Sequence, residues 1–279
     1  MLYKAAWLAI LALCLCGASD AHELAWQQAQ FANGSGNAPE PRRSAGCGAA
    51  GTGTGEFKPL ATQVNGRDRS YHLRVPRKYD ANRAYPLIFR WHGRGGDGLS
   101  GGLGIEFSAG DDAIIVGADG FNKTWDTSAA SEDLAFFDSM LAAVEERYCI
   151  DRNRVFSYGF SAGGFFTNYL ACERSDVLRA SAAIAGGPSD GSCKGRVAGW
   201  FLHDTGDDAV PMDLGESARD RALAANGCSA DASNAGDGCV RYAGCGSAPV
   251  VWCQSSGFGH DIRGDFAPPR VWKFFQQLR

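Results

Sequence analysis

The stretch RVFSYGFSAGGFF, residues 154–166, places a serine between glycines at the junction of two apolar runs. Residues 155–158 predict a buried strand, and residues 162–172 predict a helix. Most serines at such a junction cap the helix, but residues 159–163 fit G-x-S-x-G. In that motif the chain turns so sharply that glycines are needed two residues before and after the serine. The context favours Ser161 as a nucleophile held at the start of a helix.

The segments around this turn predict an α/β protein with a mostly parallel sheet. A helix with an acidic start is predicted at 132–149, and a helix that begins with prolines at 267–279. Strands, some followed by loops, are predicted at 70–76, 85–93, 113–120, 179–187, 197–208 and 250–260. In such sheets the ligand site lies at the carboxyl ends of the strands. With the turn at Ser161, this pattern predicts the α/β-hydrolase fold.

The N-terminus has the order of a secretory signal peptide. Lys4 precedes an apolar run at 5–16 and then small residues, with cleavage expected after Ala21. The run is shorter than the roughly 20 residues of a membrane span, so no membrane partner is expected. A lipidated cysteine at Cys14 or Cys16 is the weaker alternative. We therefore predict a signal peptide at 1–21, a flexible arm at 22–45 and one α/β-hydrolase domain at 46–279.

Charge and cysteine usage limit the partners. The formal net charge is −4 with no basic block, so nucleic acid is not an expected partner. Of ten cysteines, Cys14 and Cys16 lie in the leader; the remaining eight are even in number and exported, which predicts disulfides. There is no C-x-x-C pair, so neither a metal nor another cofactor is expected. The oligomeric state stays open.

A serine nucleophile needs a base, and the chain has five histidines. In this fold the order along the chain is serine, acid, histidine. His203 and His260 follow Ser161, and His260 lies in a glycine-flanked late loop, so we predict that His260 is the base. The acid is expected in the run GWFLHDTGDDAVP, where Asp207 is preferred and Asp208 and Asp204 are the alternatives.

The oxyanion of the transition state requires backbone N–H donors. Ala162, directly after the serine, supplies one. The loop WHGRGGDG, residues 91–98, follows a buried strand and supplies the second, which we assign to Arg94. A phosphate-binding glycine loop is the rival interpretation, but the loop lacks the G-K-[ST] ending.

Together these motifs resemble the secreted branch of carbohydrate esterases that contains feruloyl esterases and polyhydroxybutyrate depolymerases. The matching stretches are PLIFRWHGRGG, YCIDRNRVFSYGFSAGGFFTNYLACE, HDTGDDAVP and GFGHD. The family pattern H-G-T-x-D-x-x-V-P assigns the acid to Asp207, and it has glycine where this chain has Asp204. The resemblance covers residues 47–279 and is more specific for the esterase fold than for the substrate.

The resemblance implies an ester substrate, with a feruloylated plant polysaccharide favoured. Trp125 and Phe258 are then candidates for an aromatic wall around a phenolic acid, with core packing as the equal alternative. Polyester depolymerase and acetylxylan esterase are the main rivals, and a peptidase or a binding module with a degenerate triad are weaker ones.

Spacing and the resemblance also suggest one disulfide. Cys149 and Cys172 each end a predicted helix beside the nucleophile strand, so we predict that they are bonded to each other. The four later cysteines, 228, 239, 245 and 253, are expected to pair among themselves or with Cys47 and Cys193.

Overall fold

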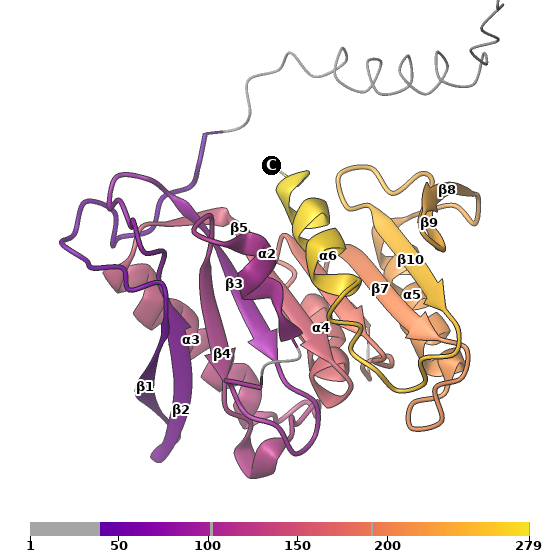
Figure 1. Cartoon of the computed structure of the whole chain (residues 1–279), viewed down its shortest axis with the longest axis horizontal. Coiled ribbons are helices and arrows are strands. Elements are labelled where there is room, and N and C mark those ends of the chain that lie inside the picture. Colours follow the sequence, from indigo (N-terminus) through magenta and orange to yellow (C-terminus); the bar gives the residue numbers. More distant parts are fainter. Residues whose placement is uncertain (1–39, 101–102, 191, 279) are drawn as a thin grey trace, which may run out of the picture. The chain divides into compact units, whose positions relative to one another are not determined.

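The computed structural model describes residues 40–100, 103–190 and 192–278. Its centre is a ten-stranded sheet in the order β1-β2-β4-β3-β5-β6-β7-β10-β9-β8 (Figure 1). Strands β4, β3, β5, β6, β7 and β10 run parallel, and antiparallel strands complete both edges. The strands are β1 (Phe57–Val64), β2 (Arg67–Arg74), β3 (Tyr85–Trp91), β4 (Ile114–Ala118), β5 (Ile150–Phe160), β6 (Ala180–Ile184), β7 (Ala198–Asp204), β8 (Ala232–Gly236), β9 (Cys239–Tyr242) and β10 (Val250–Ser255).

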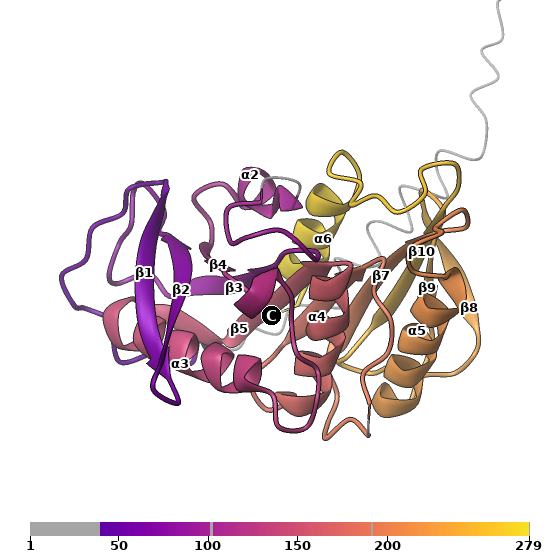
Figure 2. The ribbon, with the colours of Figure 1, turned by 90° about the horizontal axis from the view of Figure 1, so that it is seen from below.

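Helices cover both faces of the sheet, so its central strands are buried on both sides. The helices are α2 (Ile105–Ala109), α3 (Glu132–Arg147), α4 (Ala162–Glu173), α5 (Met212–Asn226) and α6 (Ala267–Gln276), with a short 3-10 turn, η2 (Phe121–Lys123). Helices α3, α4 and α5 lie on one face, while α2 and α6 lie on the other (Figure 2). Every residue of β3 and of β7 is buried. The predicted α/β-hydrolase architecture is confirmed.

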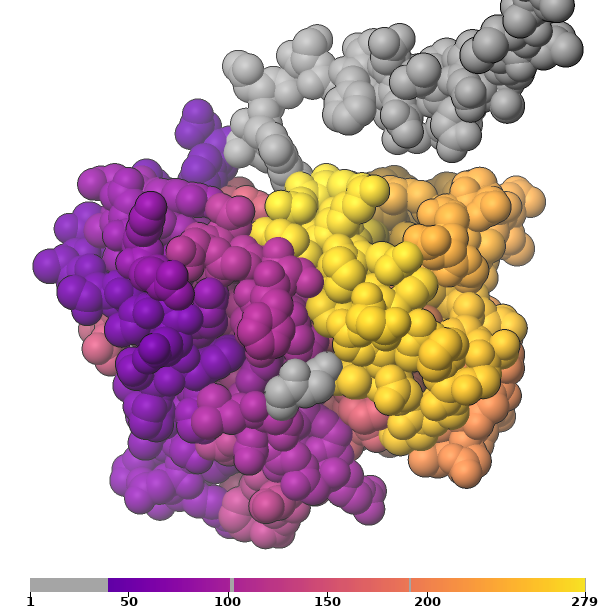
Figure 3. Space-filling model, in the orientation of Figure 1, coloured from indigo at the N-terminus to yellow at the C-terminus, as the bar shows by residue number. Residues whose placement is uncertain are grey.

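Side chains of alternate strand residues divide the core into two layers. Phe89 and Trp91 of β3 pack with Phe137 of α3 and Phe166 of α4 on one face. On the other face Phe156 of β5 stacks on Phe275 of α6, with ring centroids 4.3 Å apart. Helix α6 also packs against α2, and Figure 3 shows the C-terminal segment filling the surface beside the magenta part of the chain.

Several elements were not predicted, namely β1, β8, β9, α2 and α5, whereas β2 overlaps the strand predicted at 70–76. The hairpin β1–β2 turns at Asn65 and Gly66, both with positive φ. All five residues of β8 are exposed, so the strand has no apolar alternation. Helix α5 buries few residues and ends at Gly227 in the left-handed conformation. Within the described ranges, no helix is both long enough and apolar enough to cross a membrane.

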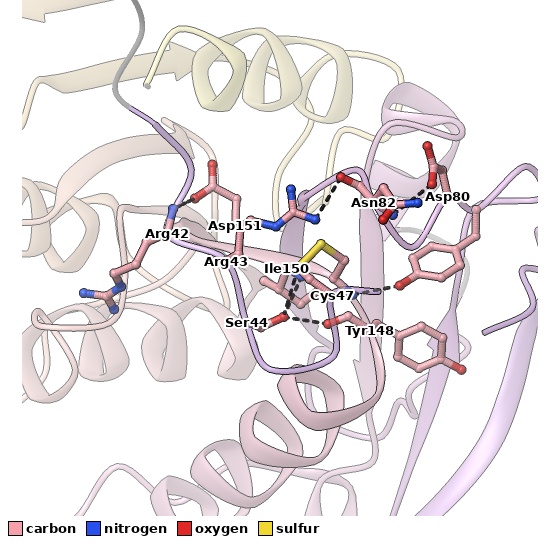
Figure 4. The surroundings of a disulfide bond; sticks show 11 residues. Arg42, Arg43, Ser44, Cys47, Asp80, Asn82, Tyr148, Ile150 and Asp151 are labelled. Atoms are coloured by element: carbon pink, nitrogen blue, oxygen red, sulfur yellow. Dashed lines mark hydrogen bonds between the residues drawn. A yellow bond between two sulfur atoms is a disulfide. The ribbon is translucent and has the colours of Figure 1, made fainter. Parts of the chain in front are cut away.

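The segment before β1 is fastened to the start of β5. Ser44 accepts a hydrogen bond from the Ile150 N–H at 2.8 Å and donates one to the Tyr148 carbonyl at 2.7 Å (Figure 4). The Arg42 N–H donates to Asp151, and Cys47 is bonded to Cys149. Residues 42–44, which the sequence analysis assigned to a flexible arm at 22–45, are therefore held by contacts with the domain. Tertiary contacts, which leave no local pattern in the sequence, fix these residues.

The predicted bond between Cys149 and Cys172 is wrong. Helix α3 ends at Arg147, and Tyr148 is already extended, so Cys149 lies at the entrance to β5 beside Cys47 rather than at a helix end. Cys172 is bonded instead to Cys193, in the connection between β6 and β7. The later cysteines pair among themselves, one of the predicted alternatives, as Cys228–Cys245 and Cys239–Cys253.

The disulfides should differ in their contribution to stability. Cys47 and Cys149 are 102 residues apart, whereas Cys239 and Cys253 are 14 apart. Chain entropy assigns about 4.7 kcal/mol to a 100-residue loop and about 3 kcal/mol to a 15-residue loop. We expect the double variant C47A/C149A to lose more free energy of unfolding than C239A/C253A, measured by guanidinium denaturation with the other bonds oxidised. An equal or reversed loss would contradict this ranking.

Candidate active site

Ser161 lies at the junction between β5 and α4, in a backbone conformation that side chains rarely adopt. Its φ is 55° and its ψ is −122°. A methyl group on Gly159 would collide with the Gly163 carbonyl, and one on Gly163 would collide with the Trp91 carbonyl. The two glycines therefore allow the turn, and the Ser161 N–H donates to the Ile184 carbonyl of β6 at 2.9 Å. The predicted sharp strand-to-helix turn is present.

Three side chains from separate loops form a hydrogen-bonded chain. His260 Nε2 lies 2.9 Å from Ser161 Oγ, and His260 Nδ1 lies 2.8 Å from Asp207 Oδ2. Because an ionised carboxylate only accepts, Nδ1 carries the proton and Nε2 is free to accept from the serine hydroxyl. The Asp207 carboxylate is fully buried, while about a fifth of the His260 side chain is exposed. The ring of Phe160 lies beside the imidazole, with centroids 4.8 Å apart.

The loop after β7 holds Asp207 ready to accept from His260. Asp207 Oδ1 accepts the N–H groups of Val210 at 2.8 Å and Ala209 at 3.0 Å. Burial acts to raise the pKa of the Asp207 carboxyl, but the bonds from Val210, His260 and Ala209 outweigh it and hold the pKa below its ordinary value. His203, buried on β7, donates from Nε2 to the Val210 carbonyl at 2.8 Å and closes the loop.

The other two carboxylates of this run lie elsewhere. Asp208 is exposed beside Asp207. Asp204 is buried and accepts hydrogen bonds from the loop that leads to His260, not from the imidazole itself. Of the three aspartates considered from the sequence, Asp207 is the one that contacts His260.

The loop after β3 lies directly beside the serine. A methyl group on Gly93 would come within 3.4 Å of Ser161 Cβ. His92 Nδ1 donates to the Gly93 carbonyl at 2.7 Å, and His92 Nε2 accepts from the Gly120 N–H at 3.0 Å. Burial lowers the pKa of His92, which suits a neutral ring with one donor and one acceptor. Because a trans peptide is planar, the Arg94 N–H points away from the fixed Gly93 carbonyl.

Close relatives share most of the chain. It is 34% identical to feruloyl esterase D of Neurospora crassa, over 84% of this chain and 90% of the relative. It is also 34% identical to the probable feruloyl esterase C of Aspergillus niger, over 82% of this chain and 92% of the relative. The chain belongs to the feruloyl esterase family. It is therefore a serine carboxylic-ester hydrolase, and the resemblance inferred from the motifs is confirmed. No family model matches the sequence.

Solved structures agree on the fold of this feruloyl esterase family member. The acetyl xylan esterase from Aspergillus awamori superposes with a TM-score of 0.66 at 13% identity, over 80% of this chain and 99% of that one. A ferulic acid esterase from Anaeromyces mucronatus in complex with ferulic acid gives 0.55 at 17% identity, over 80% and 90%. At these identities the likeness concerns the fold alone.

A cleft of about 710 Å³ opens at Ser161 and His260 of this esterase. Ligand sites for small molecules commonly have volumes of about 300–1,000 Å³. The lining around Ser161 and His260 is more apolar than polar, and Arg94 is one of its residues. It consists of Gly93, Arg94, Thr124, Trp125, Thr127, Phe160, Ser161, Ala162, Phe165, Ala209, Val210, Leu214 and His260.

The two aromatic residues predicted for the cleft have different places. Trp125 lines it, yet the side chain is also part of the core: it stacks on Phe166, and its Nε1 donates to the His92 carbonyl at 2.8 Å. Core packing therefore applies to Trp125, and its part in an aromatic wall around a phenolic acid stays a prediction. Phe258 is half exposed and does not line the cleft, and its ring lies 3.5 Å below the Arg263 guanidinium.

Sequence reasoning gave no role to several residues that support the site. His92 was given no role and His203 was considered only as the other histidine after Ser161, although both lie at carboxyl ends of predicted parallel strands, where a ligand site is expected. Phe165 and Leu214 of the cleft carry no such signal, because apolar residues on helices are usually core. Among the described residues, no three His, Cys, Asp or Glu side chains gather to hold a metal ion.

The geometry separates Asp207 from its neighbour Asp208. We expect D207N to lower kcat for p-nitrophenyl acetate by about three to four orders of magnitude, because an amide no longer holds the imidazole with Nδ1 protonated. The matched control D208N changes an exposed carboxylate one residue away and should keep nearly full activity. A silent D207N with a damaging D208N would show that the wrong aspartate has been assigned.

Proposed function

We propose that the protein is a feruloyl esterase that uses Ser161, His260 and Asp207 as a catalytic triad. The carrying observation is the continuous chain of hydrogen bonds, 2.9 Å and 2.8 Å long, from Ser161 Oγ through His260 to Asp207. At Ser161 these hydrogen bonds reach an open cleft. The relatives of the protein are named feruloyl esterases.

In this proposal Ser161 Oγ attacks the ester carbonyl as His260 Nε2 takes its proton. The N–H groups of Ala162 and Arg94 stabilise the oxyanion; Ala162 is the first residue of α4, where the N–H has no partner within the helix. The imidazolium then gives its proton to the leaving alcohol, and an acyl-enzyme remains. Water, deprotonated by His260, attacks the acyl carbon, and the proton returns to Ser161 as the acid leaves.

The lining of the cleft supports an aromatic acyl group. Trp125, Phe165 and Leu214 offer apolar surface near Ser161, while the hydroxyls of Thr124 and Thr127 are available for phenolic substituents. Relatives named feruloyl esterases, and a fold neighbour solved with ferulic acid, favour a hydroxycinnamoyl ester. We take the substrate to be a feruloylated plant polysaccharide such as arabinoxylan, in which the polysaccharide is the alcohol part of the ester.

We further propose that the protein acts outside the cytoplasm. The described part of the chain has four disulfides, and disulfides form and persist in oxidising compartments. The predicted signal peptide at 1–21 and most of the arm at 22–45 lie outside the described residues.

The triad predicts a specific pH dependence. A histidine must be neutral to accept the serine proton, and histidine is the side chain that ordinarily changes charge between pH 5 and 8. Asp207, with its lowered pKa, is ionised throughout this interval and adds no titration of its own. We expect kcat/KM for methyl ferulate to rise with pH across pH 5–8. A flat profile would argue against a histidine base.

The substrate class can be tested by comparing esters and one cleft variant. We expect release of ferulate from arabinoxylan, and a higher kcat/KM for methyl ferulate than for acetylated xylan or polyhydroxybutyrate film. F165A should lower kcat/KM for methyl ferulate by about tenfold and for p-nitrophenyl acetate much less. Only methyl ferulate has an aromatic ring in its acyl group, and that ring loses a contact. The control F107A alters an exposed ring on α2 and should change neither. Preference for acetyl or polyester substrates would contradict the proposal.

A further inference from the structure

Asp204 is a buried carboxylate that joins three parts of the chain. It is the last residue of β7 and is 4% exposed. Its four donors are neutral N–H and O–H groups. Oδ1 accepts from the Gly206 N–H at 2.9 Å and the Gly259 N–H at 3.1 Å; Oδ2 accepts from Ser255 Oγ at 2.8 Å and the Phe258 N–H at 3.3 Å.

These donors belong to the two loops whose side chains must meet. Gly206 directly precedes Asp207, and Gly259 directly precedes His260. Ser255 ends β10, which pairs in parallel with β7, so Ser255 lies opposite Asp204 in the register. One carboxylate therefore ties the Asp207 loop, the end of β10 and the His260 loop together at the carboxyl edge of the sheet.

We propose that Asp204 is a positioning residue that fixes His260 against Asp207 by holding the backbone of residues 258–259. The inference rests on the triad proposed above. At this position the family pattern H-G-T-x-D-x-x-V-P has glycine, whereas this chain has Asp204. Glycine has no side chain that could make these hydrogen bonds.

The His260 loop needs such an anchor because its own backbone is permissive. Gly257 and Gly259 both have positive φ, at 82° and 65°, and glycine restricts the chain least. Two further bonds of the loop are local: the Asp261 N–H donates to the Gly259 carbonyl, and the Asp261 carboxylate accepts from the Arg263 N–H. Catalytic groups have to be held within about 0.5 Å, and a misplacement of about 1 Å can cost about 10²-fold in rate.

The test is a double-mutant cycle between Asp204 and His260, with p-nitrophenyl acetate as substrate. We expect D204A to lower kcat by about 10²-fold with KM changed less than about twofold, since the cleft lining is untouched. In the H260A background, the same change should alter the residual rate less than about threefold, because there is no imidazole left to position. D208A, an exposed neighbour, is the matched control and should behave as the wild type.

Two milder variants guard against loss of folding in D204A. S255A removes one of the four donors and should lower kcat by about threefold to tenfold. D204N keeps one oxygen acceptor and should fall between D204A and the wild type. In a proton NMR spectrum of the exchangeable protons, the signal of the His260 Nδ1 proton in the hydrogen bond to Asp207 should weaken or broaden in D204N and S255A but not in D208A.

The outcomes separate the two proposals. Wild-type activity in H260A would contradict the proposed catalytic triad itself. A strongly impaired H260A, together with the same fold-loss of its residual rate from D204A as in the wild-type background, would overturn the role of Asp204, as would a change in KM alone. If D204A does not fold, an unchanged kcat and Nδ1 proton in both S255A and D204N would overturn it.

Discussion

The turn at Ser161 is the constraint on which the rest of the site depends. A residue other than glycine holds a φ of 55° only when its surroundings compensate for the strain. Here the compensation comes from both directions: the Ser161 N–H donates to β6, and the Ser161 carbonyl accepts the Phe165 N–H in the first turn of α4. Gly159 and Gly163 then allow helix and strand to approach closely enough for the serine to stand at the edge of the sheet.

The parallel sheet brings the remaining groups to the same edge. Strands β3, β7 and β10 run parallel to β5 and end at the same edge of the sheet, and the loops after them carry Arg94, Asp207 and His260. At the opposite end of β5, the disulfide between Cys47 and Cys149 and the hydrogen bonds of Ser44 fasten the entrance of the strand. The nucleophile strand is thus fixed at one end by covalent and polar contacts and at the other by the turn.

Sequence patterns predicted the parts of the structure that are encoded locally. The glycines around Ser161 and the buried strands are short-range signals, and the chain order of serine, acid and histidine limited the base to His203 or His260. The cysteine pairing failed because it depended on whether Cys149 ends a helix or enters a strand, a difference of two residues. The contacts of Asp204 could not be predicted either, because three of its four donors lie more than fifty residues away.

The most direct measurement of this account is covalent labelling of the nucleophile. Diethyl p-nitrophenyl phosphate should release one nitrophenolate per protein molecule and leave a diethylphosphoryl group on Ser161, identified by mass spectrometry of the peptide that contains it. Labelling should vanish in S161A and be strongly slowed in H260A, because the imidazole no longer takes the serine proton. A label on another residue, or undiminished ester hydrolysis by S161A, would contradict the central claim that the strained turn presents Ser161 as the nucleophile.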